Sequence, residues 1–277
     1  RVGKHAPVSR GFVRAGVRPS LFFDPTQVKA AIVTAGGLCP GMNNVIRQIV
    51  RDLHHLYGVD TVYGVKDGFI GFHGVRRVEG AEPELLTVKS VNHIHHFGGS
   101  CIGSGRGGFD ADKIIHFLQK YGVNQLYIIG GDGTMRAANA LSQELLAREL
   151  PITVAGLVSV DNDVGLIDRS FGFTTAVAAA QDAIQAAKTE AVSAHNGIGL
   201  VKLMGREAGF IAAYASLASG DVDACLIPEV PIVLHGEAGI LPHIKSVLER
   251  RENAVVVIAE GAGQELMKGA VVWCGGG

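Results

Sequence analysis

Short apolar runs alternate with longer segments of helical periodicity along most of the chain. The first apolar run, residues 29–35, is followed by 43–56, where apolar residues recur every three to four positions, as on one face of a helix. The same pairing repeats along the sequence. It predicts strands at 29–35, 61–65, 125–134 (running into a turn), 152–160, 197–204, 223–229 and 254–260. It predicts helices at 43–56, 110–122, 135–150, 174–191, 206–219 and 238–251.

This alternation indicates an α/β fold with a doubly wound parallel sheet, because the strands are apolar throughout and must be covered on both faces. Such sheets bind ligands at the carboxyl ends of their strands. Glycine-rich or acidic clusters follow five of the predicted strands: GGLCPG (36–41), GGDGT (130–134), DND (161–163), MGR (204–206) and AEGAG (259–263). If the chain forms two similar lobes, we expect the division near residues 155–158.

Composition narrows the class of protein. Hydrophobic residues make up 47% and charged residues 18%, which excludes a mainly disordered chain. The 25 basic residues do not exceed the 26 acidic ones, so bulk electrostatic binding of nucleic acid is not expected. No apolar run approaches the ~18 residues that span a bilayer. The four cysteines contain no C-x-x-C pair, which is typical of reduced thiols rather than of a disulfide framework or a zinc site.

The first 23 residues carry five basic side chains and no acidic one. We interpret residues 1–28 as a basic N-terminal arm, with the tail of an organelle transit peptide as the alternative. The expected location is therefore the cytoplasm, with a plastid as the second choice.

The GGDGT motif combines a strand end, glycines and the start of a helix. Glycines let the backbone approach a ligand, and a helix N-terminus favours phosphate. Asp132 cannot bind phosphate itself, but it can hold a Mg²⁺ ion that bridges phosphate oxygens. The competing interpretation makes Asp132 an ordinary helix cap in a tight turn.

The DND motif places Asp161 and Asp163 on the same side of an extended segment. Two carboxylates so close together are unfavourable unless something uses them. One suits general-base work on a hydroxyl, and the other suits metal or hydroxyl binding. An Asx-rich turn is the alternative.

Three further patterns carry less information. GSGRGG (103–108) fits G-x-G-x-x-G but follows no clear strand, which argues against a Rossmann cofactor site. The histidines of HIHH (93–96) do not have the spacing of a common helical zinc site, which favours a surface helix end. Lys202 and Arg206 bracket an LMG sequence and suit either an anionic ligand or surface ion pairs.

Together, six ordered blocks resemble the 6-phosphofructokinases, above all the plant-type ATP-dependent branch, which shares the forms LCPG, VKLMGR and CLIPE. The blocks are TAGGLCPGMNNVIRQIV, GGSCIGSGRGG, YIIGGDGTMRAANAL, VDNDVGLIDRSFGFTTAV, GIGLVKLMGREAGFIAAYASLASGDVDACLIPEVP and VIAEGAGQEL. They extend over roughly residues 14–266. The resemblance implies the two-lobed fold of that family, with a nucleotide-binding lobe at 29–157 and a sugar-phosphate-binding lobe at 158–277.

The resemblance also implies a role for individual residues. Those implied to bind the nucleotide and its phosphates are Gly37, Arg106, Gly131, Asp132, Gly133 and Thr134. Mg²⁺ is implied on Asp132. Those implied to bind the sugar phosphate are Ser159, Asp161, Asp163, Met204, Gly205, Arg206 and Glu260. Asp161 is implied to be the base that takes the proton from the 1-hydroxyl of the sugar.

Departures from the family pattern bear on the donor and on the fold. Pyrophosphate-dependent relatives carry a second aspartate where this chain has Gly133, which favours ATP as the donor. Val158 replaces a lysine that could pair pyrophosphate, Ser159 replaces threonine, and Thr174 replaces the aspartate of FGFDTAV. Relatives run on past the last residue of this sequence with a tract that supplies His and Arg contacts to the sugar phosphate. We therefore expect the sugar-phosphate-binding lobe to be truncated.

The implied activity is that of an ATP-dependent 6-phosphofructokinase, a glycolytic and allosteric kinase. It transfers the γ-phosphate of ATP to fructose 6-phosphate with Mg²⁺, and it assembles as a homo-oligomer, a dimer or tetramer. Two alternatives stay open. One is a pyrophosphate-dependent phosphofructokinase, and the other is a non-catalytic subunit that binds nucleotide and regulates a partner.

Overall fold

Strand β1 (Lys29–Thr34) is the centre of the first of two sheets, and Ala30 to Thr34 are buried. The computed structural model describes residues 20–74, 82–165 and 167–267, so most of the predicted basic arm lies outside the described residues. The first sheet has the order β3-β2-β1-β4-β5. Its other strands are β2 (Thr61–Val65), β3 (Glu84–Leu85), β4 (Gln125–Gly130) and β5 (Thr153–Val158). All pair in parallel except the short β3, which the sequence pattern did not predict.

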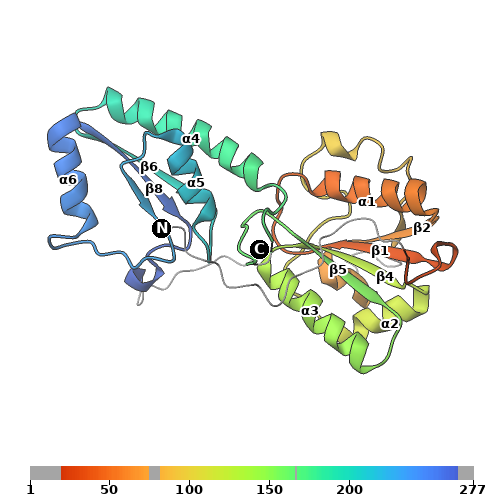
Figure 1. Ribbon diagram of the computed structural model, residues 1–277. Helices are drawn as coiled ribbons and strands as arrows, with labels where there is room; N and C mark the ends of the chain where they lie inside the picture. Colours follow the sequence, from red (N-terminus) through yellow and green to blue (C-terminus); the bar gives the residue numbers. More distant parts are fainter. Residues whose placement is uncertain (1–19, 75–81, 166, 268–277) are drawn as a thin grey trace, which may run out of the picture.

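Helices cover both faces of this sheet, as the doubly wound pattern predicts. Helix α1 (Met42–Tyr57) packs on one face through Met42, Ile46 and Val50. Helices α2 (Ala111–Tyr121) and α3 (Asp132–Ala147) pack on the other face. Figure 1 shows α1 above the sheet and α2 and α3 below it. We call this sheet with its helices the first lobe.

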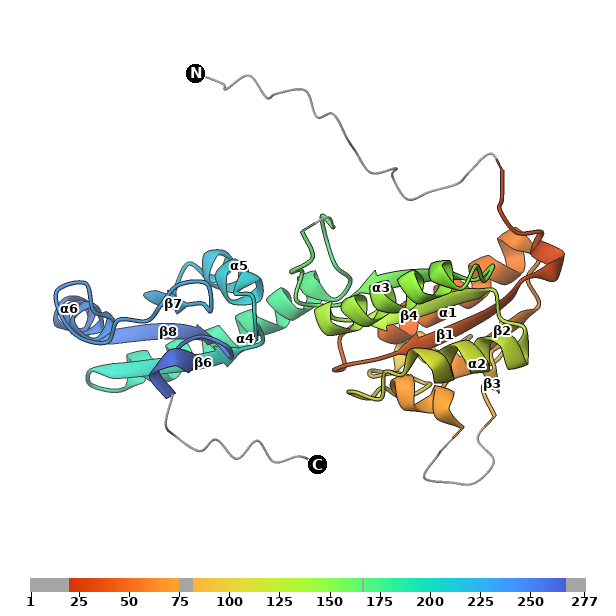
Figure 2. The ribbon, with the colours of Figure 1, turned by 90° about the horizontal axis from the view of Figure 1, so that it is seen from below.

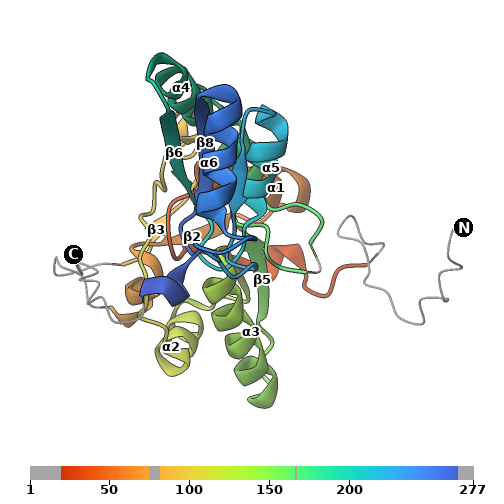
Figure 3. The same ribbon diagram turned by 90° about the vertical axis from the view of Figure 1, so that its left-hand side faces the viewer.

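The second lobe is a smaller parallel sheet with the order β6-β8-β7. Its strands are β6 (Gly197–Leu203), β7 (Ala224–Leu226) and β8 (Asn253–Ala259). Helices α4 (Phe173–Ser193) and α5 (Phe210–Ser219) pack on one face, and α6 (Ile240–Arg251) packs on the other. Helix α4 connects the lobes in the elongated molecule of Figure 2, and α6 stands in front of the sheet in Figure 3.

Short 3-10 helices complete the described structure: Pro25–Gln27, Gly68–His73, Ile94–His96 and Gln264–Met267. The HIHH histidines therefore lie on a short, partly exposed helical turn, as predicted for a surface helix end. Within the described ranges, no helix is both long and apolar enough to cross a membrane.

Several predicted boundaries differ from the structure, most clearly the starts of α3 and α5 and the extent of β7. Helix α3 begins at Asp132 rather than at residue 135, because extended Gly131 leads straight from β4 into the helix without a separate turn. Helix α5 begins at Phe210 rather than at 206, because Gly205 has a φ of 132° and sends residues 206–209 out as a loop. Strand β7 keeps only three of the seven predicted residues.

Candidate active site

The carboxyl ends of both sheets face one cavity between the lobes. It has a volume of about 630 Å³ and is lined from the ends of β1, β4 and β5 on one side and of β6 and β8 on the other. All thirteen predicted site residues line it: Gly37, Arg106, Gly131, Asp132, Gly133, Thr134, Ser159, Asp161, Asp163, Met204, Gly205, Arg206 and Glu260. We call Gly37, Arg106 and 131–134 the first-lobe wall, and we call 204–207 and Glu260 the second-lobe wall.

Two glycine-rich loops interlock on the first-lobe wall. The Gly36 amide donates to the Gly105 carbonyl at 2.9 Å, and the Ser104 hydroxyl donates to the Gly36 carbonyl at 3.0 Å. The Arg106 guanidinium lies beside Gly37, where a Cβ would be 3.7 Å from it. GSGRGG therefore lies in a loop locked to the end of β1, and no strand of the described structure leads into it, so it is not a Rossmann fingerprint.

The N-terminus of α3 is the centre of the first-lobe wall. No side chain caps this end of the helix, whose first amides and dipole favour an anion. The Thr134 hydroxyl donates to the Ala35 carbonyl at 3.1 Å and is buried. A Cβ at Gly130 would lie 2.3 Å from the same carbonyl, so only glycine fits where β1 and β4 end together. Asp132 is not a helix cap; its carboxylate pairs with Arg136 one turn later.

Asp161 and Asp163 are presented by a turn that Asn162 holds. Asn162 has a φ of 58°, and its side-chain oxygen accepts the Ser170 amide at 2.7 Å. Burial raises the pKa of the Asp161 carboxyl above its ordinary range, and the Asp163 and Glu260 carboxylates raise it further. Because the Asn162 side chain makes the hydrogen bond that holds this turn, the carboxylates of Asp161 and Asp163 are available to a ligand.

The Asp163 carboxyl is in a similar position. Burial is the largest cause that raises its pKa, and the Asp132 and Glu207 carboxylates raise it further, while a hydrogen bond from its own backbone amide and the nearby Arg136 lower it. Its Oδ1 atom is buried and, among the described residues, has no hydrogen-bond partner. A buried acceptor without a partner, in a cavity that also holds Asp132, fits a bound cation.

A magnesium ion fits these side chains only if substrate phosphates and water complete its coordination. Within residues 20–74, 82–165 and 167–267, no group of three or more His, Cys, Asp or Glu side chains is arranged to hold a metal. Mg²⁺ in phosphate-transfer sites is commonly bound by one or two carboxylates together with substrate phosphates and water. Asp132 at the anion-binding end of α3 provides such a carboxylate.

Backbone hydrogen bonds hold the second-lobe wall. The Gly261 amide donates to the Gly205 carbonyl at 3.0 Å, and the Glu260 amide donates to the Leu203 carbonyl at 2.9 Å. A Cβ at Gly205 would lie 2.4 Å from the Ala208 carbonyl, which makes glycine necessary there. This packing directs the exposed Arg206 into the cavity, whereas Lys202 on β6 is exposed and does not line it.

Comparison with known proteins agrees with this arrangement. A family model described as Phosphofructokinase matches residues 29–272. The chain belongs to the phosphofructokinase family.

Relatives of this phosphofructokinase chain include plant enzymes. ATP-dependent 6-phosphofructokinase 7 of Arabidopsis thaliana is 49% identical over 267 residues, which is 96% of this chain and 54% of the relative. ATP-dependent 6-phosphofructokinase 4, chloroplastic, of the same plant is 48% identical over 256 residues, 92% of this chain and 47% of the relative. The solved structure of Pichia pastoris phosphofructokinase matches with a TM-score of 0.73 at 25% identity, covering 91% of this chain and 28% of that one. The chain spans about half the length of the curated relatives it matches.

The cavity-lining side chains of this phosphofructokinase chain that the sequence did not indicate include two aromatic and two charged ones. Phe69 and Phe109 pack edge to face, with ring centroids 5.5 Å apart. Arg136 and Glu207 place opposite charges on the two walls. Of these four, only Arg136 could have been found from the sequence. It follows Asp132 by four positions, and residues with that spacing are neighbours on one face of a helix.

Val158, the second position of the donor argument, does not face the cavity. Val158 ends β5 with only 6% of its surface exposed and does not line the cavity. The valine itself therefore makes no contact with a ligand in the cavity, whereas Gly133 lines it.

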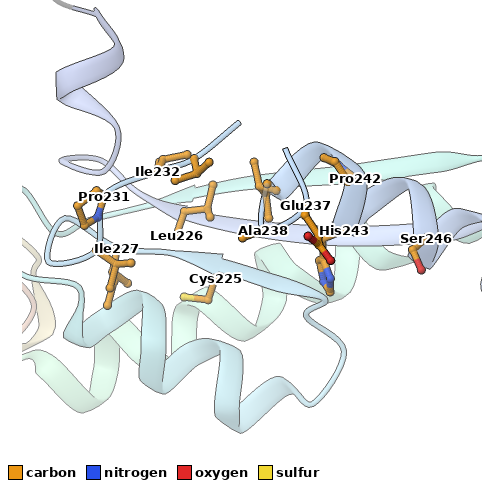
Figure 4. Close-up of a pocket in the computed structure, with 14 residues that line it drawn as sticks. Cys225, Leu226, Ile227, Pro231, Ile232, Glu237, Ala238, Pro242, His243 and Ser246 are labelled. Carbon is orange, nitrogen blue, oxygen red and sulfur yellow. The ribbon is translucent and has the colours of Figure 1, made fainter. Parts of the chain in front are cut away.

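A second cavity of about 520 Å³ lies between β7, the following loop and α6. Figure 4 shows Glu237, His243 and Ser246 toward its α6 end and Ile227, Pro231 and Ile232 toward the other. The first cavity is lined by five carboxylates and three guanidiniums, whereas this one is mainly apolar with a single carboxylate. The charged cavity between the lobes is therefore the better candidate for phosphate chemistry.

Proposed function

We propose that the chain is the catalytic part of an ATP-dependent 6-phosphofructokinase, with residues 29–157 binding the nucleotide and 158–277 binding the sugar phosphate. The observation that carries the proposal is the place of Asp161, which lines the cavity between an uncapped helix N-terminus and the Arg206–Glu260 side. Phosphoryl transfer needs anion donors, a metal and one carboxylate beside the attacking hydroxyl.

The first-lobe wall suits the donor. Amides at the start of α3 and the Arg106 guanidinium bind the phosphates of ATP, and glycines at 37, 131 and 133 let the phosphate chain come close to the backbone. Magnesium bound at Asp132 supplies charge neutralisation to the phosphate that is transferred. A Cβ at Gly133 would meet nothing within 4 Å, so this position leaves open space for the nucleotide.

The second-lobe wall suits fructose 6-phosphate. Arg206 pairs the sugar phosphate, Glu260 accepts hydrogen bonds from sugar hydroxyls, and Ser159 and Asp163 lie on the same side as Asp161. Asp161 accepts the proton of the 1-hydroxyl as that oxygen attacks the γ-phosphorus, and ADP leaves. Its raised pKa makes it a stronger base than an ordinary aspartate.

A coupled assay with fructose 6-phosphate tests the proposal. We expect turnover with ATP and Mg²⁺, less with pyrophosphate, and a kcat lowered on the order of 10²- to 10⁴-fold in Asp161→Asn with ATP affinity kept. Turnover that depends on pyrophosphate alone would favour the pyrophosphate-dependent enzyme. ATP binding by calorimetry without turnover would favour a nucleotide-binding subunit.

We also propose that the chain self-associates. Phe210, Tyr214 and Leu217 follow one face of α5 and are 42%, 55% and 82% exposed, an apolar stripe suited to a second copy. Sedimentation velocity should give a dimer or tetramer, and Leu217→Glu should shift it toward monomer. A parent protein that sediments as a monomer at assay concentration contradicts this.

We propose a cytoplasmic location, with a plastid as the alternative that the names of two relatives raise. Fluorescence microscopy of the tagged natural gene product distinguishes the two.

A further inference from the structure

Arg136 and Glu207 have no role in the catalysis proposed above, yet together with Asp132 they form a line of charges across the cavity. Arg136 lies one turn after Asp132 on α3, and its guanidinium contacts the Asp132 carboxylate. The same guanidinium lies 4.0 Å from the carboxylate of Glu207 on the second-lobe wall. A single cation therefore stands between two carboxylates that belong to different lobes.

Neither partner of the cross-lobe pair is fixed by packing. The side chains of Arg136 and Glu207 are each 70% exposed, whereas that of Asp132 is 35% exposed. Side chains on a helix lean toward its N-terminus, so the Arg136 guanidinium lies beside Asp132 over the first turn of α3. It can change partners by rotating its own side chain.

We propose that Arg136 is a positioning residue that exchanges Asp132 for Glu207 when a metal–nucleotide binds. The inference rests on the proposed function, which puts the metal on Asp132. A divalent cation on that carboxylate removes the partner of Arg136 and repels its guanidinium. Glu207, 4.0 Å away, is the carboxylate across the cavity that can then take its place. Because Glu207 directly follows Arg206, the new pair draws the sugar-phosphate side toward the donor.

This exchange predicts that the effect of substituting Glu207 on metal–nucleotide affinity depends on whether Arg136 is present. In the parent chain, the Arg136–Glu207 pair offsets the broken Arg136–Asp132 pair. In Glu207→Gln nothing offsets it, so metal–nucleotide binding becomes weaker. In an Arg136→Gln background there is no pair to exchange, so the same Glu207 substitution has no effect. Coupling of this kind is measured by a double-mutant cycle.

The experiment is calorimetric titration with Mn²⁺ and ADP, which bind without turnover, on the full chain. Variants are Arg136→Gln, Glu207→Gln and the double variant. We expect Glu207→Gln to weaken Mn²⁺–ADP binding roughly two- to fivefold, the range for an exposed ion pair, and to change nothing in the Arg136→Gln background. Arg148→Gln is the matched control, because it removes an exposed arginine that pairs with Asp112 and Glu144 at the other end of α3.

Adding fructose 6-phosphate supplies a second readout. The parent should bind Mn²⁺–ADP more tightly with fructose 6-phosphate present, and either single variant should lose part of that gain. An equal effect of Glu207→Gln in both backgrounds overturns the inference, since Glu207 then acts through its own charge. No effect in either background overturns it as well. If Asp132→Asn binds Mn²⁺–ADP as tightly as the parent, the result contradicts the metal site of the proposed function. That outcome is distinct from the two that overturn the partner exchange of Arg136.

Discussion

The two walls of the cavity are built by different means. The first-lobe wall is mostly backbone: two glycine loops bonded to each other, an uncapped helix end and a buried threonine whose hydroxyl donates to the end of β1. The second-lobe wall presents side chains. Met204, Arg206 and Glu260 are all exposed, and the hydrogen bonds that hold this wall run behind them through Gly205 and Gly261.

This difference separates two kinds of recognition. Backbone amides bind any phosphate, so the first-lobe wall depends on how closely the chain can approach the ligand. We therefore expect this wall to be disrupted by substitutions that add a Cβ to a glycine rather than by substitutions that remove a side-chain functional group. Side chains bind particular groups, so the second-lobe wall should lose affinity for its ligand without losing its fold. Substitutions on each wall test that separation.

The largest effect is expected where backbone packing is tightest. Gly130→Ala puts a Cβ 2.3 Å from the Ala35 carbonyl. We expect it to lower the free energy of unfolding by about 1–3 kcal/mol and to weaken ATP binding. Gly133→Ala in the same motif meets nothing within 4 Å and should be neutral or stabilise by about 0.5 kcal/mol. Urea unfolding measures the stability of both variants. Equal destabilisation by the two variants would contradict the close-approach argument.

A charge at Gly133 tests the same wall without disturbing the fold. Gly133→Asp has open space, and an acid in the first turn of a helix is stabilising, so the variant should fold. Its carboxylate should repel the phosphate chain of ATP and lower kcat/KM for ATP roughly ten- to a hundredfold. Gly133→Asn is the matched control of the same size. If Asn and Asp lower ATP use equally, the effect is steric and Gly133 does not select the donor through charge.

A smaller effect is expected on the second-lobe wall. Arg206→Gln should raise KM for fructose 6-phosphate roughly tenfold, as loss of a charged hydrogen bond would, with kcat, ATP affinity and stability nearly kept. Arg206→Lys should recover part of the affinity, because lysine keeps the charge but not the two-pronged geometry. Loss of stability in Arg206→Gln would show that this wall, too, depends on packing.

The sequence predicted elements wherever one helix face or one apolar run defined them. Helix α1 was expected at 43–56 and spans Met42–Tyr57, because its buried residues recur with helical spacing. The start of α5 was missed, because the loop before it depends on the bond between Gly261 and Gly205, which lie far apart in sequence. Two-residue β3 is too short to show any period.

The residues that the resemblance implied all line one cavity, because the topology brings together the strand ends that carry most of them. What could not be predicted is which side chains meet across the lobes. Glu207 follows a recognisable MGR motif, yet its approach to Arg136 depends on how two separate sheets face each other. Likewise, Val158 lies beside the DND motif in sequence but turns into the core.

The subtlest test concerns Asp161, which stands where the two walls meet. Its pKa is raised above the ordinary aspartate value of 3.8, so its base form should be lost, and kcat should fall, at a higher pH than for an ordinary aspartate. Removing a neighbouring negative charge favours the ionised form and lowers that pKa. The acid limb of the kcat profile should therefore move to lower pH in Asp163→Asn, and by less in Glu260→Gln, because Asp163 is the stronger of the two influences. Burial is the largest cause of the shift, so neither variant should return the limb to the ordinary value. A limb that moves upward in either variant, or stays in place in both, would assign the acid limb to another group and detach Asp161 from the proton transfer.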